Sequence, residues 1–187
     1  MTTAQEQDVV DLLMAQHDEI KSLFAQVKTA QGSEKRERFQ ELVRLLAVHE
    51  SAEEEVVHPA ARRPAGAEVV EERLHEEDDA KHVLAELHDM GVDHPEFDAR
   101  FAAFERAVIA HATHEEQEEF PELRQDMGED RLRRMAGAVR AAEAVAPTRP
   151  HPQAGESAVA NLLVGPPTAV FDRMRDAVRD WRQRQSP

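Results

Sequence analysis

A chain of 187 residues can bury a full core as one domain, or as one domain with an appendage, without a metal to hold the fold together. It contains no cysteine, which excludes disulfide bonds, thiolate zinc sites, cysteine-ligated iron–sulfur clusters and a cysteine nucleophile. The formal net charge of −15 argues against a nucleic-acid partner, because phosphate binding needs a basic face. The polar start and the lack of an apolar run of about twenty residues lead us to expect a cytoplasmic protein with no membrane partner.

The first two predicted helices each carry an apolar stripe that a histidine or a carboxylate interrupts. Residues spaced alternately by three and four lie on one face of a helix. The first stripe ends before Gly32 and consists of Val10, Leu13, His17, Ile20, Phe24 and Val27. The second stripe ends before Pro64 and consists of Phe39, Leu42, Leu46, His49, Glu53, Val56 and Ala60. We therefore expect His49 and Glu53 to lie one turn apart on a buried face.

The third and fourth predicted helices repeat this pattern. The third stripe, which Gly91 ends, consists of Val70, Leu74, Glu77, Ala80, Leu84 and Leu87. The fourth stripe consists of Phe97, Phe101, Phe104, Val108, His111 and Glu115, and it then reaches acidic residues around Glu118 and Glu119. The HxxxE spacing of the second helix thus recurs in the fourth helix, at His111 and Glu115.

These elements predict an all-α fold, an up-down-up-down four-helix bundle with additional C-terminal helices. The bundle is expected over residues 1–128, and residues 129–187 form a second region. That region is expected to hold a fifth helix from Glu129 to about Ala146 and a proline-rich linker to about Ser157. It is expected to end in an amphipathic helix whose apolar side carries Val170, Phe171, Met174, Val178 and Trp181.

The interrupted stripes predict a metal site inside the bundle. Burying an ionised carboxylate in a helical core costs several kcal/mol unless it is paired or coordinated, and no Lys or Arg shares these stripes. A pair of cations is the simplest common partner, and bundle cores hold such dimetal sites. Nitrogen and oxygen ligands without sulfur favour two non-haem iron ions, with manganese or zinc as alternatives. The predicted ligands are His17, His49, Glu53, Glu77, His111 and Glu115.

Other histidines offer rival assignments. His114 and Glu118 form a second HxxxE pair on the fourth helix, but His114 falls in line with a surface-like face. His75 and His82 share the polar face of the third helix, so we expect both in solvent. His58 precedes a proline and is expected at a helix end beside solvent, although it could approach the mouth of the site.

At these residues the chain resembles the hemerythrin-like, HHE cation-binding family. The match runs from about Asp8 to Arg124, through QHDEI, HESAEEEVVHPA, EEDDAKHVLAEL and HATHEEQEEFPEL. The resemblance implies a four-helix bundle with a non-haem di-iron centre, and the matching ligand positions are His17, His49, Glu53, His111 and Glu115. Glu50 matches a position that is an extra ligand in some members. Glu77 stands where the family usually has a histidine on the third helix.

The glutamate at this position directs the functional hypothesis. An anionic ligand in place of a neutral imidazole favours the ferric state, which shifts the expectation from oxygen carriage toward peroxide chemistry. We therefore expect a di-iron enzyme that consumes hydrogen peroxide, with Glu50 or Glu53 relaying protons. The alternative is a protein that binds or senses dioxygen, nitric oxide or iron without turnover. A small-molecule oxidant is the expected partner, and a monomer or homodimer the expected assembly.

Overall fold

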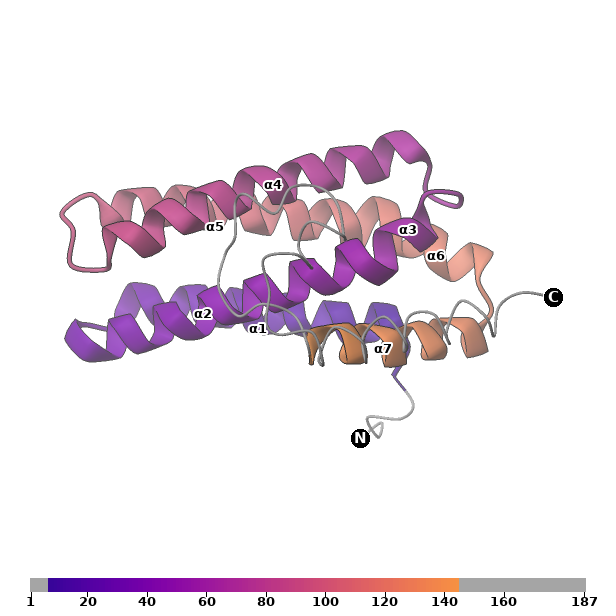
Figure 1. Cartoon of the computed structure of the whole chain (residues 1–187), viewed down its shortest axis with the longest axis horizontal. Coiled ribbons are helices and arrows are strands. Elements are labelled where there is room, and N and C mark those ends of the chain that lie inside the picture. Colours follow the sequence, from indigo (N-terminus) through magenta and orange to yellow (C-terminus); the bar gives the residue numbers. More distant parts are fainter. Residues whose placement is uncertain (1–6, 145–187) are drawn as a thin grey trace, which may run out of the picture.

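The computed structural model describes residues 7–144, which form the bundle in Figure 1. The described residues contain helices and no strand. In chain order the elements are α1 (Val9–Thr29), α2 (Gly32–Ala52), η1 (Glu53–Val57), α3 (His58–Ala61), α4 (Ala67–Met90), α5 (Phe97–His114), η2 (Glu115–Glu119), α6 (Phe120–Asp126) and α7 (Glu129–Glu143). The predicted linker and last amphipathic helix lie outside the described residues.

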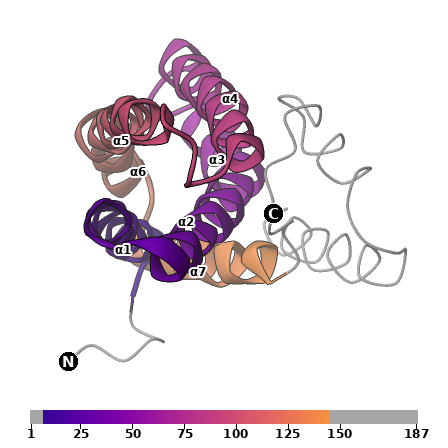
Figure 2. The ribbon, with the colours of Figure 1, turned by 90° about the vertical axis from the view of Figure 1, so that its left-hand side faces the viewer.

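Four long helical rods run antiparallel, as the short connections between stripes predicted. The second rod continues from α2 through η1 into α3, and the fourth from α5 through η2 into α6. Helix α1 packs on α2 and α5, and α4 packs on α5 and α2, so the rods occupy four corners around one interior (Figure 2). The predicted up-down-up-down bundle is confirmed. Among residues 7–144 the backbone takes a positive φ at three positions, each of them a glycine: Gly32, Gly66 and Gly91.

The apolar core is divided into two clusters. One cluster surrounds five phenylalanines near the α1–α2 and α4–α5 connections: Phe24, Phe39, Phe97, Phe101 and Phe104. The other lies at the opposite end of the bundle and includes Val9, Leu13, Val56 and Phe120. On every rod, the polar residues that interrupt the stripe fall between members of the two clusters. A polar layer therefore crosses the bundle between two apolar regions.

Helix α7 is part of this core. Its side chains Met135, Ala136 and Val139 are fully buried and belong to the same cluster as Val9 and Leu13. The helix packs on α1, α2 and η1 (Figure 1). The expected fifth helix is thus packed against the bundle.

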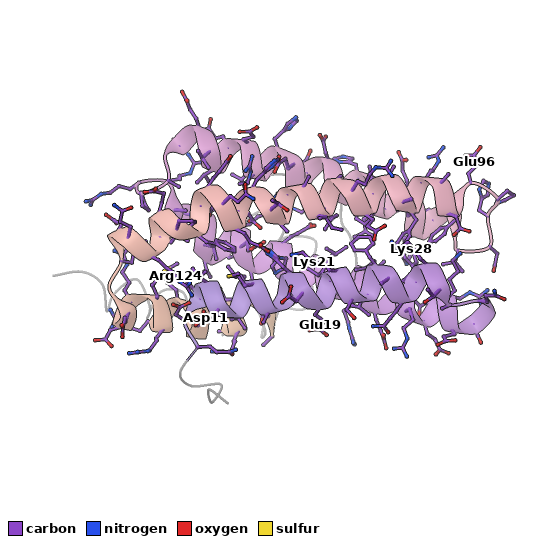
Figure 3. All side chains as sticks on the ribbon, turned by 180° about the vertical axis from the view of Figure 1, so that it is seen from behind. Asp11, Glu19, Lys21, Lys28, Glu96 and Arg124 are labelled. Atoms are coloured by element: carbon purple, nitrogen blue, oxygen red, sulfur yellow. The ribbon has the colours of Figure 1, made fainter. Side chains whose placement is uncertain are left out.

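An ion pair joins the start of α1 to α6, because Arg124 lies 2.5 Å from Asp11 (Figure 3).

Candidate metal centre

The polar layer brings together the six residues that the sequence analysis selected. His17, His49, Glu53, Glu77 and Glu115 are each at most 3% exposed. His111 is 11% exposed, at the edge of the layer. Each of the four rods contributes at least one of these side chains.

Two overlapping sets of four residues can each hold one metal ion. The first set is His17, His49, Glu53 and Glu115, and the second is Glu53, Glu77, His111 and Glu115. Within each set the potential ligand atoms lie within 4.8 Å of one another. Glu53 and Glu115 belong to both sets, and a carboxylate that faces two ions can bridge them.

A wide π-helical turn begins at each shared glutamate. Elements η1 and η2 start at Glu53 and Glu115, and the N–H groups five residues later, at positions 58 and 120, donate to the carbonyls of these glutamates. A proline follows each turn, Pro59 after η1 and Pro121 after η2. Since proline lacks an N–H group, the regular bond to the carbonyl four residues earlier cannot form there. Such widened turns are frequent at functional sites.

The wide turns advance the buried face by one residue, and this overturns the expectation for His58. In a regular α-helix the stripe would continue to Ala60, but Ala61 is fully buried instead. His58 is only 1% exposed and is not beside solvent. Its Nδ1 lies 3.1 Å from Glu119 Oε1, and its Nε2 contacts Glu77. The sequence carries one sign of this irregular turn, because Pro59 directly follows His58 and cannot donate the regular helical hydrogen bond.

The rival histidines are outside the layer, as expected. His114 is 41% exposed and its HxxxE partner Glu118 is 51% exposed. On α4, His75 and His82 are 72% and 55% exposed. The register that uses His111 is therefore the one that faces the interior.

Outer hydrogen bonds fix the orientation of the three predicted histidine ligands. His17 Nδ1 lies 2.9 Å from Glu116, His49 Nδ1 lies 2.8 Å from Gln16 Oε1, and His111 Nδ1 lies 3.0 Å from Glu76. Carboxylate and carbonyl oxygens accept, so each Nδ1 carries the donated proton. In the neutral ring the unprotonated Nε2 then faces the glutamates. This is the arrangement of metal-binding histidines held by an outer oxygen.

Burial and mutual charge set the ionisation of the layer. Burial and the neighbouring His17 lower the pKa of His49 to about 3, so this imidazole is neutral. Burial alone would raise the pKa of Glu115, but His111 and His17 hold it at about 2. Burial raises the pKa of Glu50 to about 8, although Lys81 acts in the opposite direction.

The residues present fit a pair of cations. Several buried atoms have no hydrogen-bond partner among the described residues, and they include both carboxylate oxygens of Glu53 and Glu115 and the Nε2 atoms of His17 and His111. Buried polar atoms of this kind call for a partner. Lys81 supplies only part of the missing positive charge, because its Nζ lies 4.0 Å from Glu77 and closer to Glu54.

A small cavity adjoins the layer on the side of the phenylalanine cluster. The volume open to the centre of a water-sized molecule is about 20 Å³, enough for a ligand of a few atoms. Its polar wall includes His17, His49, Glu50 and His111, and its apolar wall includes Ile20, Leu46, Ala80, Val108 and Ala112. The predicted catalytic residue Glu50 is thus 4% exposed and lines the cavity, while Glu53 is fully buried in the layer.

An antiparallel four-helix bundle with a buried layer of imidazoles and carboxylates defines the class of metal-binding helical bundles. This chain belongs to the hemerythrin HHE cation-binding domain family, which it matches over residues 8–123. Members of this family bind metal cations, and among residues 7–144 the buried histidines and glutamates of the layer could hold them. No helix among residues 7–144 is long and apolar enough to cross a bilayer.

Two relatives add to this comparison. The fold is similar to a hemerythrin HHE cation-binding domain-containing protein from Mycobacterium kansasii, with a TM-score of 0.65 and 19% identity over 92% of this chain and 97% of that one. The sequence is 25% identical over 140 residues to a protein of Nostoc sp. called a DNA nickase, covering 74% of this chain. The matched part is 40% of that relative, so the chain spans less than half of its length.

Proposed function

We propose that the polar layer is a non-haem di-iron centre. His17 and His49 would bind one ion, Glu77 and His111 the other, and Glu53 and Glu115 would bridge them. The proposal is supported by the two overlapping sets of ligand atoms and by the unpartnered oxygens that face them. Imidazole and carboxylate ligands suit iron, whereas manganese and zinc are the alternatives that the same atoms can hold.

We further propose that the centre acts on hydrogen peroxide. The single observation that carries this proposal is a cavity of about 20 Å³ whose polar wall joins three candidate histidine ligands to Glu50. When bound, two iron ions supply and accept the electrons that convert two molecules of hydrogen peroxide into two of water and one of dioxygen. The cavity of about 20 Å³ suits a ligand of a few atoms, and apolar side chains form much of its wall.

Glu50 is suited to proton transfer in this cavity. Burial raises the pKa of Glu50 to about 8 in the metal-free chain, and a carboxyl that lines the cavity can, when protonated, donate to the departing oxygen as the O–O bond breaks. The resulting carboxylate can then take one of the two protons that the second peroxide molecule loses, and the hydroxide left by the first peroxide takes the other. A neutral residue of the same shape cannot perform either transfer, and this identifies the variant to test.

The test measures oxygen evolution from hydrogen peroxide by the iron-loaded protein, together with its metal content. We expect oxygen release from the wild type and a loss of about 10²-fold in Glu50→Gln at unchanged iron content. His75→Gln is the control, because His75 is 72% exposed, lies outside the layer and contacts Asp79 on the surface of α4. A protein with its full iron content that evolves no oxygen would overturn the proposed activity.

A second candidate is reversible binding of dioxygen or nitric oxide, favoured by the apolar wall of Ile20, Leu46 and Val108. It predicts an absorption change with either gas and no consumption of peroxide. The nickase name belongs to a longer protein, and we propose no nucleic-acid partner for this acidic chain. A cytoplasmic location and a monomeric or homodimeric state stay predictions.

A further inference from the structure

A fourth histidine in the layer is built like the three predicted ligands. In His17, His49 and His111 the Nδ1 atom meets an outer oxygen and the Nε2 atom faces a glutamate of the layer. His58 has the same arrangement, with Nδ1 3.1 Å from Glu119 and Nε2 against Glu77. Packing alone does not require that one ring nitrogen meets an outer oxygen while the other meets a glutamate of the layer.

The backbone places His58 for this role. The turn η1 is one residue wider than a regular turn, so position 58 lies below Glu53, to whose carbonyl its N–H donates. In a regular α-helix a residue five positions later would point about 140° away. The corresponding position after η2 is Phe120, which stacks on His17 with ring centroids 5.8 Å apart. Position 58 after η1 thus places an imidazole against Glu77, and the corresponding position after η2 places the Phe120 ring against His17.

We propose that His58 is a further metal-binding side chain, which binds through Nε2 the same ion as Glu77, and that Glu119 is its positioning residue. This assignment rests on the dimetal centre of the proposed function. His58, Glu115 and Glu119 lie within 4.8 Å of one another, so the imidazole adjoins a shared glutamate as well as Glu77. Both Glu119 and His58 are at most 1% exposed, and the second oxygen of Glu119 has no hydrogen-bond partner among the described residues.

The assignment balances the two metal positions. Without His58, one position has two imidazoles, from His17 and His49, and the other has only His111. With His58 each ion has two imidazoles, and the second ion also keeps Glu77. The imidazole absent from α4 is then supplied by the second rod, which packs beside α4. The competing arrangement is a protonated His58 that pairs with Glu77 and Glu119 and binds no metal.

Proton NMR of the cobalt(II)-substituted full chain distinguishes these arrangements. An imidazole that binds cobalt through Nε2 gives one strongly shifted, solvent-exchangeable Nδ1–H signal. We expect four such signals in the wild type, three in His58→Gln and four in the control His75→Gln. Three signals in the wild type, or no loss in His58→Gln, would overturn the assignment. A complete absence of shifted signals would overturn the metal centre together with it.

Variants of the positioning residue keep the assignment testable if His58→Gln fails to fold. Glu119→Gln retains an oxygen that accepts from His58 Nδ1, so four signals and the wild-type cobalt affinity are expected. Glu119→Leu removes the acceptor, and we expect weaker binding of one of the two cobalt ions by roughly 10- to 100-fold. Equal affinities in the two variants would contradict the role of Glu119. These readouts need no peroxide turnover, so an inactive protein with four signals would refute only the proposed activity.

Discussion

Burial in the layer opposes the charged forms of Glu53 and His49. Glu53 is fully buried, and burial together with the neighbouring Glu115 raises its pKa. His49 has the opposite shift, to about 3, because burial and His17 oppose its protonation. A carboxylate and an imidazole with these shifts are both best stabilised as ligands of a cation.

Removal of one proposed ligand should therefore affect metal binding and stability together. In His49→Ala we expect loss of at least one bound ion and a lower Tm of the metal-loaded protein, because binding free energy contributes to folding. Metal analysis and thermal unfolding on the same sample make the comparison, with His75→Ala as the control. A neutral or stabilising effect of His49→Ala would indicate a polar layer that no longer binds metal.

The metal-free protein should lose stability as the pH rises from about 6.5 to 9. Burial raises the pKa of Glu50 to about 8 and that of Glu54 to about 7. Burial would lower the pKa of His111, but Glu115 and Glu76 raise it to about 9. Groups with a raised pKa bind more protons in the folded than in the unfolded chain, so folding is weakened as these protons are lost.

Urea unfolding of chelator-treated protein at several pH values measures this dependence. The free energy of unfolding is expected to fall steadily across the window. Added zinc should stabilise the protein more at pH 8 than at pH 6.5, because the ions replace the protons. A free energy of unfolding that rises with pH in the metal-free protein would contradict the assigned shifts.

At the scale of the elements, the wide turns determine which side chains reach the layer. A shift of one residue at η1 and η2 moves positions 58 and 120 to the interior. Pro59 and Pro121 preserve this geometry, because neither can donate the bond that a regular helix would need.

Replacing Pro59 by alanine should weaken metal binding while keeping the helices. The alanine N–H can bond to the carbonyl of Glu55 and restore a regular turn, which rotates His58 by roughly 100°. We expect about a tenfold loss of affinity in a chelator competition and unchanged far-ultraviolet circular dichroism. Pro64→Ala, in the α3–α4 connection, is the matched control. Unchanged affinity in Pro59→Ala would show that the turn does not depend on this proline.

The periodicity of the sequence predicts which side chains a regular α-helix places on its buried face, but not where the helix becomes irregular. All six selected residues fall in one layer because the three-and-four spacing holds as far as Glu53 and Glu115. His58 was expected in solvent because the same spacing was continued through a turn that is not α-helical. The cavity beside Glu50 depends on side chains from several rods, so no single stripe could reveal it.

At the scale of the whole molecule, α7 completes the apolar end of the bundle. Met135 is fully buried against the cluster that contains Val9 and Leu13. The core of the described residues therefore continues past residue 128, where the sequence analysis placed the end of the bundle.

Truncation of this side chain tests how α7 contributes. Met135→Ala should lower the free energy of unfolding by about 2–4 kcal/mol, since it leaves a cavity in a closed cluster. The control Met14→Ala should change it by less than about 0.5 kcal/mol, because Met14 is 41% exposed. Urea unfolding of both variants makes the comparison. Equal effects would mean that α7 contributes little to the stability of the bundle.

The shared layer also has a consequence for chain entropy. Its side chains come from distant parts of the sequence: His17 and Glu116, which meet at its edge, are 99 residues apart. Ions held there would link all four rods at once and restrict the unfolded chain as long-range cross-links do. A protein without cysteine would thereby gain a reversible cross-link between its rods. The supply of metal, and not the redox state of the surroundings, would then determine when this cross-link forms.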